Sequence, residues 1–412
     1  MSRHRAIGPS ALILAAAGLL IGGTAAWLVK LGNPGNMGLC IACFNRDIVG
    51  AFGGSWANMG GVAYLRPEIF GLLLLGATVA SFATSEFRPR GGSSVVLRFV
   101  LGFIFMLSSL IFLGCTVRAW LRLGGGDLNA LWGIGGIVAG VMVGVVMLKN
   151  GFNMGRAKTV SSALGWTGPA LIIVLLGLSL MVAFGSTPGF LTITPEGARA
   201  TAEGAVVQGE TVLRPEGAYL ADGAVFAADG EVISPVESVE KAPPMPGGRR
   251  APFAISLIAG LALGVVAQRS RFCSIGGIRD AVLVRRYDLL FGVLGLLIGA
   301  TVMNMVFGQY NLGFVGQPIA HTNALGNFAA MTVAALAAIM LGGCPFRQVI
   351  MSGEGDADAT VAVLGMFAGA LVAHRFAIAS TGAGLSDIAW PALAVMALVL
   401  AVIAFVKRER IA

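Results

Sequence analysis

The amino-acid sequence predicts an all-α polytopic membrane protein, with about ten transmembrane helices plus short re-entrant helices in two inverted repeats, and a small β-rich periplasmic insert. Three observations predict this fold. Of the 412 residues, 56% are hydrophobic and 12% are charged, with a mean hydropathy of +0.84, whereas soluble domains carry about 25% charged residues. Apolar runs long enough to cross a bilayer recur along the chain. A pattern of cysteine and arginine also occurs twice.

Ten apolar segments, each roughly 17 to 22 residues long, are the expected spans. The first five lie near 10–29, 67–84, 95–114, 131–148 and 165–185, and the second five near 252–268, 288–307, 325–342, 359–378 and 388–406. Because five is an odd number, the second half is expected to be inserted upside down relative to the first. The expected units are a first membrane repeat (1–186), an insert (187–250) and a second, inverted membrane repeat (251–412).

Most arginine and lysine residues fall on one side of the predicted membrane if the amino terminus is cytoplasmic, as the positive-inside rule requires. Both termini are therefore expected to be cytoplasmic, and the net charge of +8 is expected to come from cytoplasmic loops and to need no nucleic-acid partner. Arg249 and Arg250 fall on the opposite side. The residues that follow the rule are Arg3, Arg5, Arg88, Arg90, Arg98, Lys149, Arg156, Lys158, Arg285, Arg286, Lys407, Arg408 and Arg410.

The insert differs in composition from the two repeats. Between Thr187 and Gly248 it contains nine Asp or Glu residues and three Arg or Lys residues. Five pairs of an acidic residue and a glycine are separated by short runs rich in valine, alanine and threonine, which is typical of turns between short strands. A small β-rich unit on the periplasmic side is expected, and a disordered linker is the alternative.

The repeated pattern has two parts. Cys40 and Cys273 each begin the pattern C-x5-R-D, and Cys115 and Cys344 each lie in the pattern G-C-x2-R-x5-G-x-G-D-x2-A. The first pair is 233 residues apart and the second pair is 229 residues apart, so both parts belong to one duplicated unit. Two copies of a membrane unit predict a central site at their junction.

Each repeated cysteine is followed, three or six residues later, by an arginine. A guanidinium in the hydrocarbon region costs roughly 2.5 to 3.5 kcal/mol, so it usually faces a cavity, a partner or a substrate. We expect these arginines to attract an anion, and an interfacial position for each is the alternative. Asp47 and Asp280 are not expected to neutralise their neighbours, because adjacent residues of a helix do not face each other. The arginines are Arg46, Arg118, Arg279 and Arg347.

Glycine and aspartate precede one predicted span in each half, as Gly126-Asp127 and Gly355-Asp356. The glycines allow a tight turn, and the aspartates suit the N-cap of a helix. A helix is therefore expected to begin at each position inside the membrane, with free N–H groups available to an anion. Further accessory candidates are Cys43, Glu354 and Asp280.

The combination of thiols and guanidiniums restricts the ligand. A soft metal ion would favour the cysteines, but the arginines would repel a cation and no histidine lies in either motif, so we expect no metal and no cofactor. A small anion with oxygens at one end and sulfur or selenium at the other fits both groups. Cys40 and Cys43 form a C-x2-C pair that permits redox chemistry, although Gly276 replaces Cys43 in the second half.

These motifs resemble those of the YeeE/YedE family of sulfur-transport membrane proteins. The resemblance rests on Cys273-Ser-Ile-Gly-Gly-Ile-Arg279-Asp280 with the preceding Gln268-Arg-Ser-Arg-Phe, on Gly342-Gly-Cys344-Pro-Phe-Arg347-Gln348, and on the first-half counterparts. It implies a multi-pass thiosulfate importer of the bacterial inner (plasma) membrane, in which Cys115, Cys273 and Cys344 contact the substrate and Cys40 lies where the substrate enters. The insert and the segment 35–43 resemble the YedE branch, which is linked to selenium metabolism.

The resulting hypothesis is a transporter, and not an enzyme, that imports a small sulfur or selenium anion along a path formed by the four repeated cysteines. The alternative is a membrane-embedded transferase that forms a cysteine persulfide or selenosulfide and passes it to a small cytoplasmic sulfur-carrier protein. A non-transporting scaffold is a third hypothesis. The sequence contains no nucleotide-binding motif, so ATP-driven transport by this chain is not expected.

Overall fold

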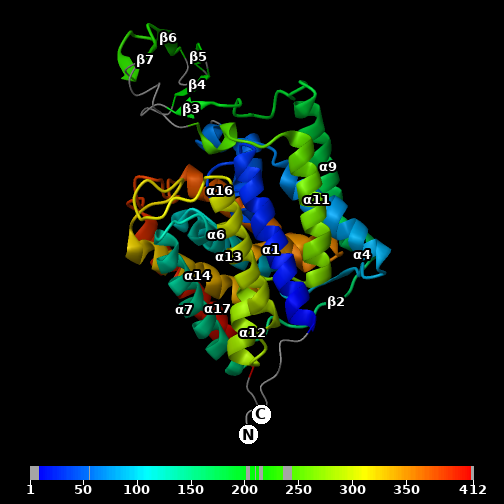
Figure 1. Ribbon diagram of the computed structural model, residues 1–412. Coiled ribbons are helices and arrows are strands. Elements are labelled where there is room, and N and C mark those ends of the chain that lie inside the picture. Colours follow the sequence, from blue (N-terminus) through cyan, green and yellow to red (C-terminus); the bar gives the residue numbers. More distant parts are fainter. Residues whose placement is uncertain are drawn as a thin grey trace.

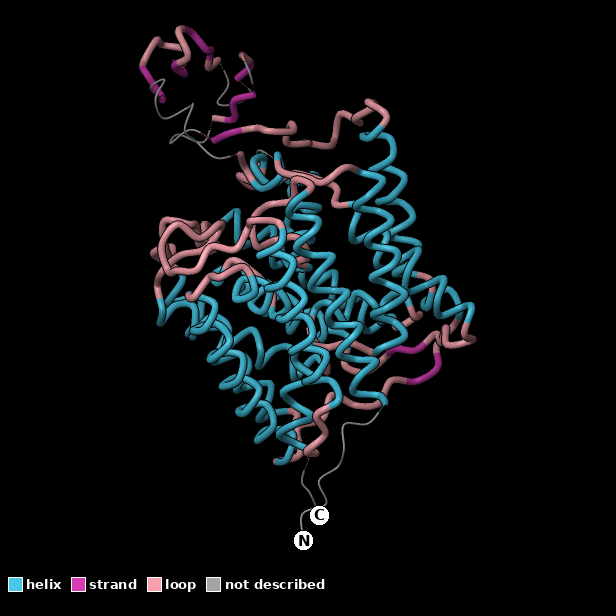
Figure 2. Tube along the Cα trace, viewed as in Figure 1, coloured by secondary structure: helices cyan, strands magenta, loops and turns pink. Residues whose placement is uncertain are grey.

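Long apolar helices dominate the computed structural model, which describes residues 9–54, 56–200, 205–208, 210–212, 217–234 and 244–409 (Figures 1 and 2). Helices suit these sequences because they satisfy their own backbone polar groups in an apolar environment. The long helices are α1 (Pro9–Lys30), α5 (Val95–Phe112), α7 (Asn129–Lys149), α9 (Thr167–Ala183), α11 (Phe253–Ser270), α13 (Asp288–Val306), α14 (Ala324–Leu341), α16 (Ala357–Arg375) and α17 (Ala389–Val406).

A further apolar span is irregular. It consists of α3 (Pro67–Phe70), the π-helical segment η2 (Gly71–Thr78) and α4 (Val79–Ala83). Within the described residues, eight helical segments are long and apolar enough to cross a membrane, so the chain is a multi-pass membrane protein. The other two of the ten expected spans are α9, with 17 residues, and the irregular span.

Four short helices alternate with the long ones. They are α2 (Ile41–Gly53), α6 (Thr116–Gly124), α12 (Ser274–Leu283) and α15 (Pro345–Gly353). Each of them starts directly after one of the repeated cysteines. The remaining helical turns are η1 (Gly60–Val62), α8 (Ser162–Gly165) and η3 (Pro246–Gly248).

The long helices pack in pairs that combine one helix from each half of the chain. Helix α1 packs against α13, and α11 packs against α3 and η2; α7 packs against α14, and α16 packs against α5. Helices α5 and α14 also pack against each other. Each half therefore contributes one partner to every major helix pair.

Glycines allow the paired helices to approach closely, as small residues do in many membrane proteins. A Cβ atom added to any of four glycines would lie 2.1 to 2.3 Å from a backbone carbonyl oxygen of the partner helix, which no side chain tolerates. The contacts are Gly22 with Leu296, Gly140 with Thr332, Gly264 with Leu72 and Gly365 with Phe99.

The π-helical segment keeps two glycines on one face. Gly71 and Gly76 are five residues apart and both contact α11: an added Cβ would lie 2.2 Å from Leu257 O and 2.4 Å from Gly264 Cα, respectively. Since a π-helix bonds residue i to residue i+5, it brings these two glycines over the same partner. In α11 itself, Gly260 and Gly264 show the ordinary four-residue spacing.

The insert forms short antiparallel strands. In the described residues, β3 (Arg199–Ala200), β4 (Val206–Gln208) and β5 (Thr211–Val212) form one sheet, and β6 (Tyr219–Ala221), β7 (Ala224–Phe226) and β8 (Val232–Ser234) form another. Ala205, Val207 and Val225 make a small core between them. The two stems of the insert are tied to the helices, since Thr192 N donates to Ala51 O at 2.8 Å and Arg66 Nη2 to Pro246 O at 2.6 Å.

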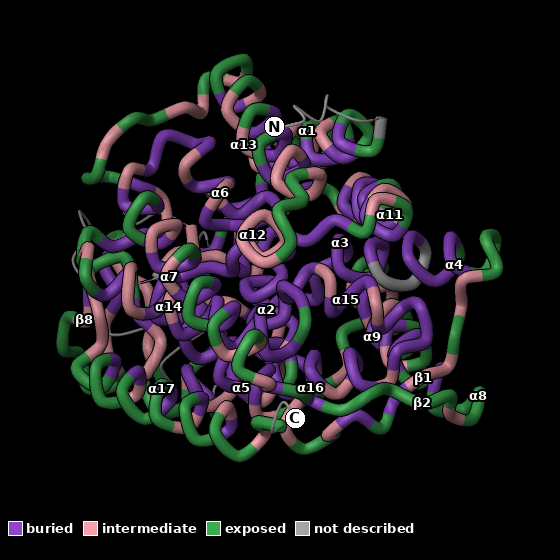
Figure 3. Tube along the Cα trace, turned by 90° about the horizontal axis from the view of Figure 1, so that it is seen from below, coloured by how far each residue is buried: buried purple, intermediate pink, exposed green. Residues whose placement is uncertain are grey.

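The insert lies at one end of the helices, here called the insert face (Figure 1). Helix α1 begins and α17 ends at the opposite end, here called the terminal face. The two-stranded ladder of β1 (Arg90–Gly91) and β2 (Lys158–Thr159) lies near the terminal face. Seen from that face, buried residues occupy the centre around α2, α6 and α15, and exposed residues lie at the rim (Figure 3). Many exposed rim residues are apolar, such as Leu12, Val146 and Leu398, as contact with lipid requires.

We predict that Gly140→Leu destabilises the protein far more than Gly177→Leu. Gly140 faces the backbone of α14, whereas a side chain at Gly177 on α9 would meet open space. Overpacking costs about 1 to 3 kcal/mol or more, so Gly140→Leu should lower the unfolding temperature of the purified protein by several degrees and Gly177→Leu should not. Equal effects of the two substitutions would contradict the close pairing of α7 with α14.

Candidate functional site

The four repeated cysteines are the N-cap residues of the four short helices. Cys40, Cys115, Cys273 and Cys344 each have extended backbone angles and are each followed by the first helical residue. All four are buried. The sulfurs of Cys40 and Cys273 accept hydrogen bonds from the backbone N–H three residues further on, at 3.3 and 3.2 Å. The duplicated motif is therefore a thiol-capped helix start in the interior.

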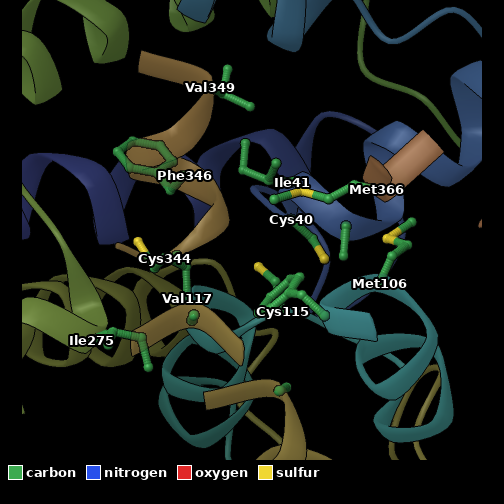
Figure 4. Close-up of a cluster of buried hydrophobic side chains, with 14 of the residues drawn as sticks. Cys40, Ile41, Met106, Cys115, Val117, Ile275, Cys344, Phe346, Val349 and Met366 are labelled. Atoms are coloured by element: carbon green, nitrogen blue, oxygen red, sulfur yellow. The ribbon is translucent and has the colours of Figure 1, made fainter. Parts of the chain in front are cut away.

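The cysteines form two groups that meet at the centre. The sulfur of Cys40 lies next to those of Cys43 and Cys115. Figure 4 shows the side chains of Cys40 and Cys115 pointing toward each other. Cys273 and Cys344 form the second group, in which Cys344 N donates to Cys273 Sγ at 3.3 Å. The first group comes from the first half of the chain and the second group from the second half.

Two hydroxyl groups join the two cysteine groups. Thr116 Oγ1 and Ser274 Oγ share a hydrogen bond at 3.0 Å, and Ser274 also neighbours the thiol of Cys344. Thr116 directly follows Cys115. The interior thus contains two groups of thiols, and the second group is extended by the hydroxyls of Ser274 and Thr116 as far as the residue next to Cys115. Sequence reasoning missed Thr116 and Ser274, because the other two repeated cysteines are followed by isoleucine and proline.

Methionine sulfurs add to the first cysteine group. Met106 and Met366 lie around Cys40 (Figure 4), and Asn45 Nδ2 approaches Met366 Sδ at 3.9 Å. Met37 Sδ lies 4.0 Å from Arg46 Nη2. These methionines are fully buried, and they make the surroundings of Cys40 unusually rich in polarisable sulfur.

Arg118 is a fully buried guanidinium with neutral partners. Its Nε donates to Asn36 O at 2.9 Å, its Nη2 to Ile319 O at 3.1 Å, and its Nη1 to Leu113 O and to Cys43 Sγ, the latter at 3.4 Å. Among the described residues no carboxylate pairs with it. Arg118 therefore places an uncompensated positive charge beside the first cysteine group.

Arg46 is also buried, but it has a carboxylate partner. Its Nη2 lies 2.6 Å from Asp47 Oδ1, and Arg66 Nε lies 2.6 Å from Asp47 Oδ2. One aspartate thus serves two guanidiniums. The expectation that Asp47 does not neutralise Arg46 is wrong, because the long arginine side chain folds back to reach the adjacent residue. Sequence reasoning also missed Arg66, which lies outside the repeated motif.

Arg279 shows the same local pairing in the second half. Its Nε lies 2.8 Å from Asp280 Oδ1, so the expectation is wrong here as well. This pair is partly exposed, with 28% and 25% of the two side chains accessible, whereas Asp47 is fully buried. The repeat has therefore placed equivalent ion pairs in different environments.

Arg347 differs from its counterpart Arg118 in having a carboxylate partner. Its Nη1 and Nη2 lie 2.9 and 3.1 Å from the two oxygens of Glu354. Arg271 Nη1 donates to the same carboxylate at 3.0 Å, and Arg271 Nη2 donates to Glu86 at 2.7 Å. The guanidinium of Arg347 is therefore held by Glu354 near the terminal face.

The glycine and aspartate residues near the site have structural roles. Gly126 and Gly355 have φ values of +95° and +90°, which favour glycine. The carboxylate of Asp356 accepts from Ala359 N at 3.0 Å, and that of Asp127 accepts from Asn129 N at 2.9 Å. These carboxylates occupy the N–H groups that were expected to be available to an anion. The interior helix starts are instead those that follow the cysteines.

No protein-family model matches the chain, and a search of curated proteins finds no similar sequence.

We predict that Asp47→Asn destabilises the protein much more than Asp280→Asn. The first substitution removes the counter-charge of two buried guanidiniums, and breaking a buried pair costs about 3 to 5 kcal/mol. The second removes a partly exposed partner, whose loss costs about 1 kcal/mol or less. Denaturant or thermal unfolding of both purified variants measures the difference, and similar losses would contradict the assignment of Asp47.

Proposed function

We propose that this chain is an inner-membrane transporter that imports a small sulfur- or selenium-containing anion through a central path lined by thiols and arginines. The observation that carries the proposal is the presence of two thiol groups at four helix starts inside the protein, with the hydrogen-bonded hydroxyls of Thr116 and Ser274 beside them. Weak S–H donors and hydroxyls can bind a soft terminal sulfur or selenium atom at successive positions without a covalent step.

The charge distribution favours an anion. Each short helix places the positive end of its dipole at a cysteine, and none has an acidic residue in its first turn. Arg118 and Arg347 are the third residues of α6 and α15, so each adds a full positive charge where the dipole is already positive. An anion at the centre would relieve this unfavourable arrangement, and a cation would make it worse.

The helix pairs support an arrangement of two inverted repeats. In the proposed repeat α1 corresponds to α11, and the span of α3 and η2 corresponds to α13. The pair of α1 with α13 is therefore equivalent to the pair of α11 with α3 and η2. Likewise α5 corresponds to α14 and α7 corresponds to α16, so the pair of α5 with α16 is equivalent to the pair of α14 with α7. Helices α9 and α17, the last spans of the two halves, do not pack at equivalent positions. Helix α9 packs against α3 and η2, whereas α17 packs against α14 and α5.

The proposed orientation places the terminal face in the cytoplasm and the insert face in the periplasm. Arg88 shortly precedes the β1–β2 ladder near the terminal face, and Arg286 lies between the end of α12 and the start of α13, which agrees with the positive-inside rule. The proposed family is YeeE/YedE, with the selenium-linked branch favoured by the insert, and this assignment depends on the motifs alone.

We predict that Cys273→Ala and Cys344→Ala each reduce uptake of labelled thiosulfate, or of a selenium oxyanion, into proteoliposomes by about tenfold or more. Each substitution removes one S–H group that would donate to the anion, and a hydrogen bond to a charged group is worth about 1.5 to 3 kcal/mol. Cys344→Ser keeps a donor and should retain more uptake than Cys344→Ala. Normal transport by both alanine variants, or no transport of either anion by the wild type, would refute the proposal.

The contact between Cys40, Cys43 and Cys115 also supports the alternative function of a sulfurtransferase. In that reaction a cysteine thiolate attacks the outer sulfur of thiosulfate, the S–S bond breaks and sulfite leaves with the electron pair. Incubation with thiosulfate would then add the mass of one sulfur atom to one cysteine and release one equivalent of sulfite. We predict neither change, and mass spectrometry of the intact protein with a sulfite assay distinguishes the two functions.

A further inference from the structure

A hollow of about 370 Å³ opens on the insert face above Arg118. It lies between the loop that follows α1, the end of α6 and the loop that follows α13. Amide side chains are unusually frequent in its wall. The lining residues used below are Asn33, Asn36, Gly125, Arg249, Asn311 and Gln317.

Arg249 brings a positive charge to this hollow. Among the described residues no carboxylate pairs with it, and burial lowers the pKa of its guanidinium without any opposing effect from a negative charge. Its neighbour Arg250 is different, because Arg250 stacks on Tyr64 and lies 3.8 Å from Glu196. Within the described part of the chain, Arg249 is thus a cation without a counter-ion, on the face where the positive-inside rule disfavours cations.

Asn36 forms the link between the hollow and Arg118. Its backbone oxygen accepts from Arg118 Nε at 2.9 Å, and its side-chain Nδ2 is buried without a hydrogen-bond partner. A buried donor without an acceptor is costly, and because Asn36 lines the hollow, an anion bound there would supply one. The carboxylate of Glu68 does not line the hollow, since Asn33 Nδ2 donates to it at 2.7 Å from within the wall.

The second repeat has a carboxylate at the position that corresponds to Gly125. Gly125 in G-G-G-D corresponds to Glu354 in G-E-G-D. At the terminal face the carboxylate of Glu354 forms a bidentate ion pair with Arg347, which is the counterpart of Arg118. The same carboxylate also binds Arg271. At the insert face the equivalent position has no side chain. The neutral side chain of Asn36 lies there instead, with its Oδ1 2.2 Å from a Cβ added to Gly125. The protein thus supplies its own oxyanion at one face and none at the other.

We infer that the hollow beside Gly125 binds a free small oxyanion, at the face where the protein has no counterpart of the Glu354 carboxylate. Arg249 and the Asn36 amide are the direct ligands, and Arg118 attracts the anion from beneath through Asn36. The ligand class is oxyanions with two or more oxygens spaced as in a carboxylate, which includes thiosulfate, selenite and sulfate. The inference rests on the proposed function in identifying this anion with the one that is transported.

The test uses Asn311→Cys, an exposed lining position, as a reporter in the purified full-length protein, whose native cysteines are buried. The rate of labelling by an anionic methanethiosulfonate reagent is divided by the rate for a cationic reagent. Adding Arg249→Gln should lower this ratio about tenfold, because a nearby charge changes local ion concentrations by such factors. Arg250→Gln should change this ratio little, because Glu196 already balances the charge of Arg250. Equal effects of the two substitutions would overturn the inference.

Protection measures binding directly. Thiosulfate, selenite or sulfate should slow labelling of Asn311→Cys by a neutral thiol reagent, and Gly125→Glu should abolish this protection by supplying a carboxylate. Gly125→Gln is the matched control of equal size, and it should retain protection. Either side chain must displace Asn36 Oδ1, which lies 2.2 Å from an added Cβ, but this atom is the end of a movable side chain. If no anion protects, or if the two Gly125 variants behave alike, the site does not exist.

These readouts need no transport. Protection by an anion that is not taken up into proteoliposomes would support the site while refuting the proposed function. Uptake without protection would support the proposed function while refuting the site.

Discussion

Four helices begin inside an apolar interior, and the backbone N–H groups of their first turns must be satisfied there. The first four N–H groups of any helix lack an intrahelical partner, and in a membrane no bulk water replaces it. Cysteine meets this need in an unusual way, because Cys40 and Cys273 accept from these N–H groups through sulfur. Serine or aspartate would cap more strongly. A thiol caps weakly and keeps a donor of its own, so the interior remains able to bind a ligand.

Arginine makes the same interior selective for charge. Arg118 and Arg347 lie in first turns, where the helix dipole disfavours a cation. The helix pairs hold these short helices in place, because glycine contacts such as Gly140 with Thr332 leave the long helices little freedom to move apart. Rigid packing at the periphery therefore maintains an electrostatic arrangement at the centre that would otherwise relax.

The sequence predicted every long helix in the described residues to within a few positions, because long apolar runs and their flanking charges determine such helices. It also singled out the four cysteines that the structure places at the starts of the short helices. It did not predict the partners of the arginines. Pairing of Arg46 with Asp47 depends on side-chain reach, and the approach of Arg66 to Asp47 depends on a loop fold with no local signature. The contact of Thr116 with Ser274 joins elements 158 residues apart, which no spacing rule reveals.

Inverted repeats alone would make a path with identical ends, so directional import requires differences between the halves. The structure contains such differences at equivalent positions. Cys43 adds a third thiol to the first group, whereas the second half has Gly276 at this position, where an added Cβ would lie 3.1 Å from Cys273 Cβ and 3.2 Å from Leu289 Cδ1. Gly125 leaves Arg118 without a carboxylate, whereas Glu354 holds Arg347. In the proposed import, an anion arriving from the insert face would meet Arg118 without a carboxylate first. To leave at the terminal face it would compete with Glu354 for Arg347, so the proposed path has different ends although the same sequence motif occurs at both.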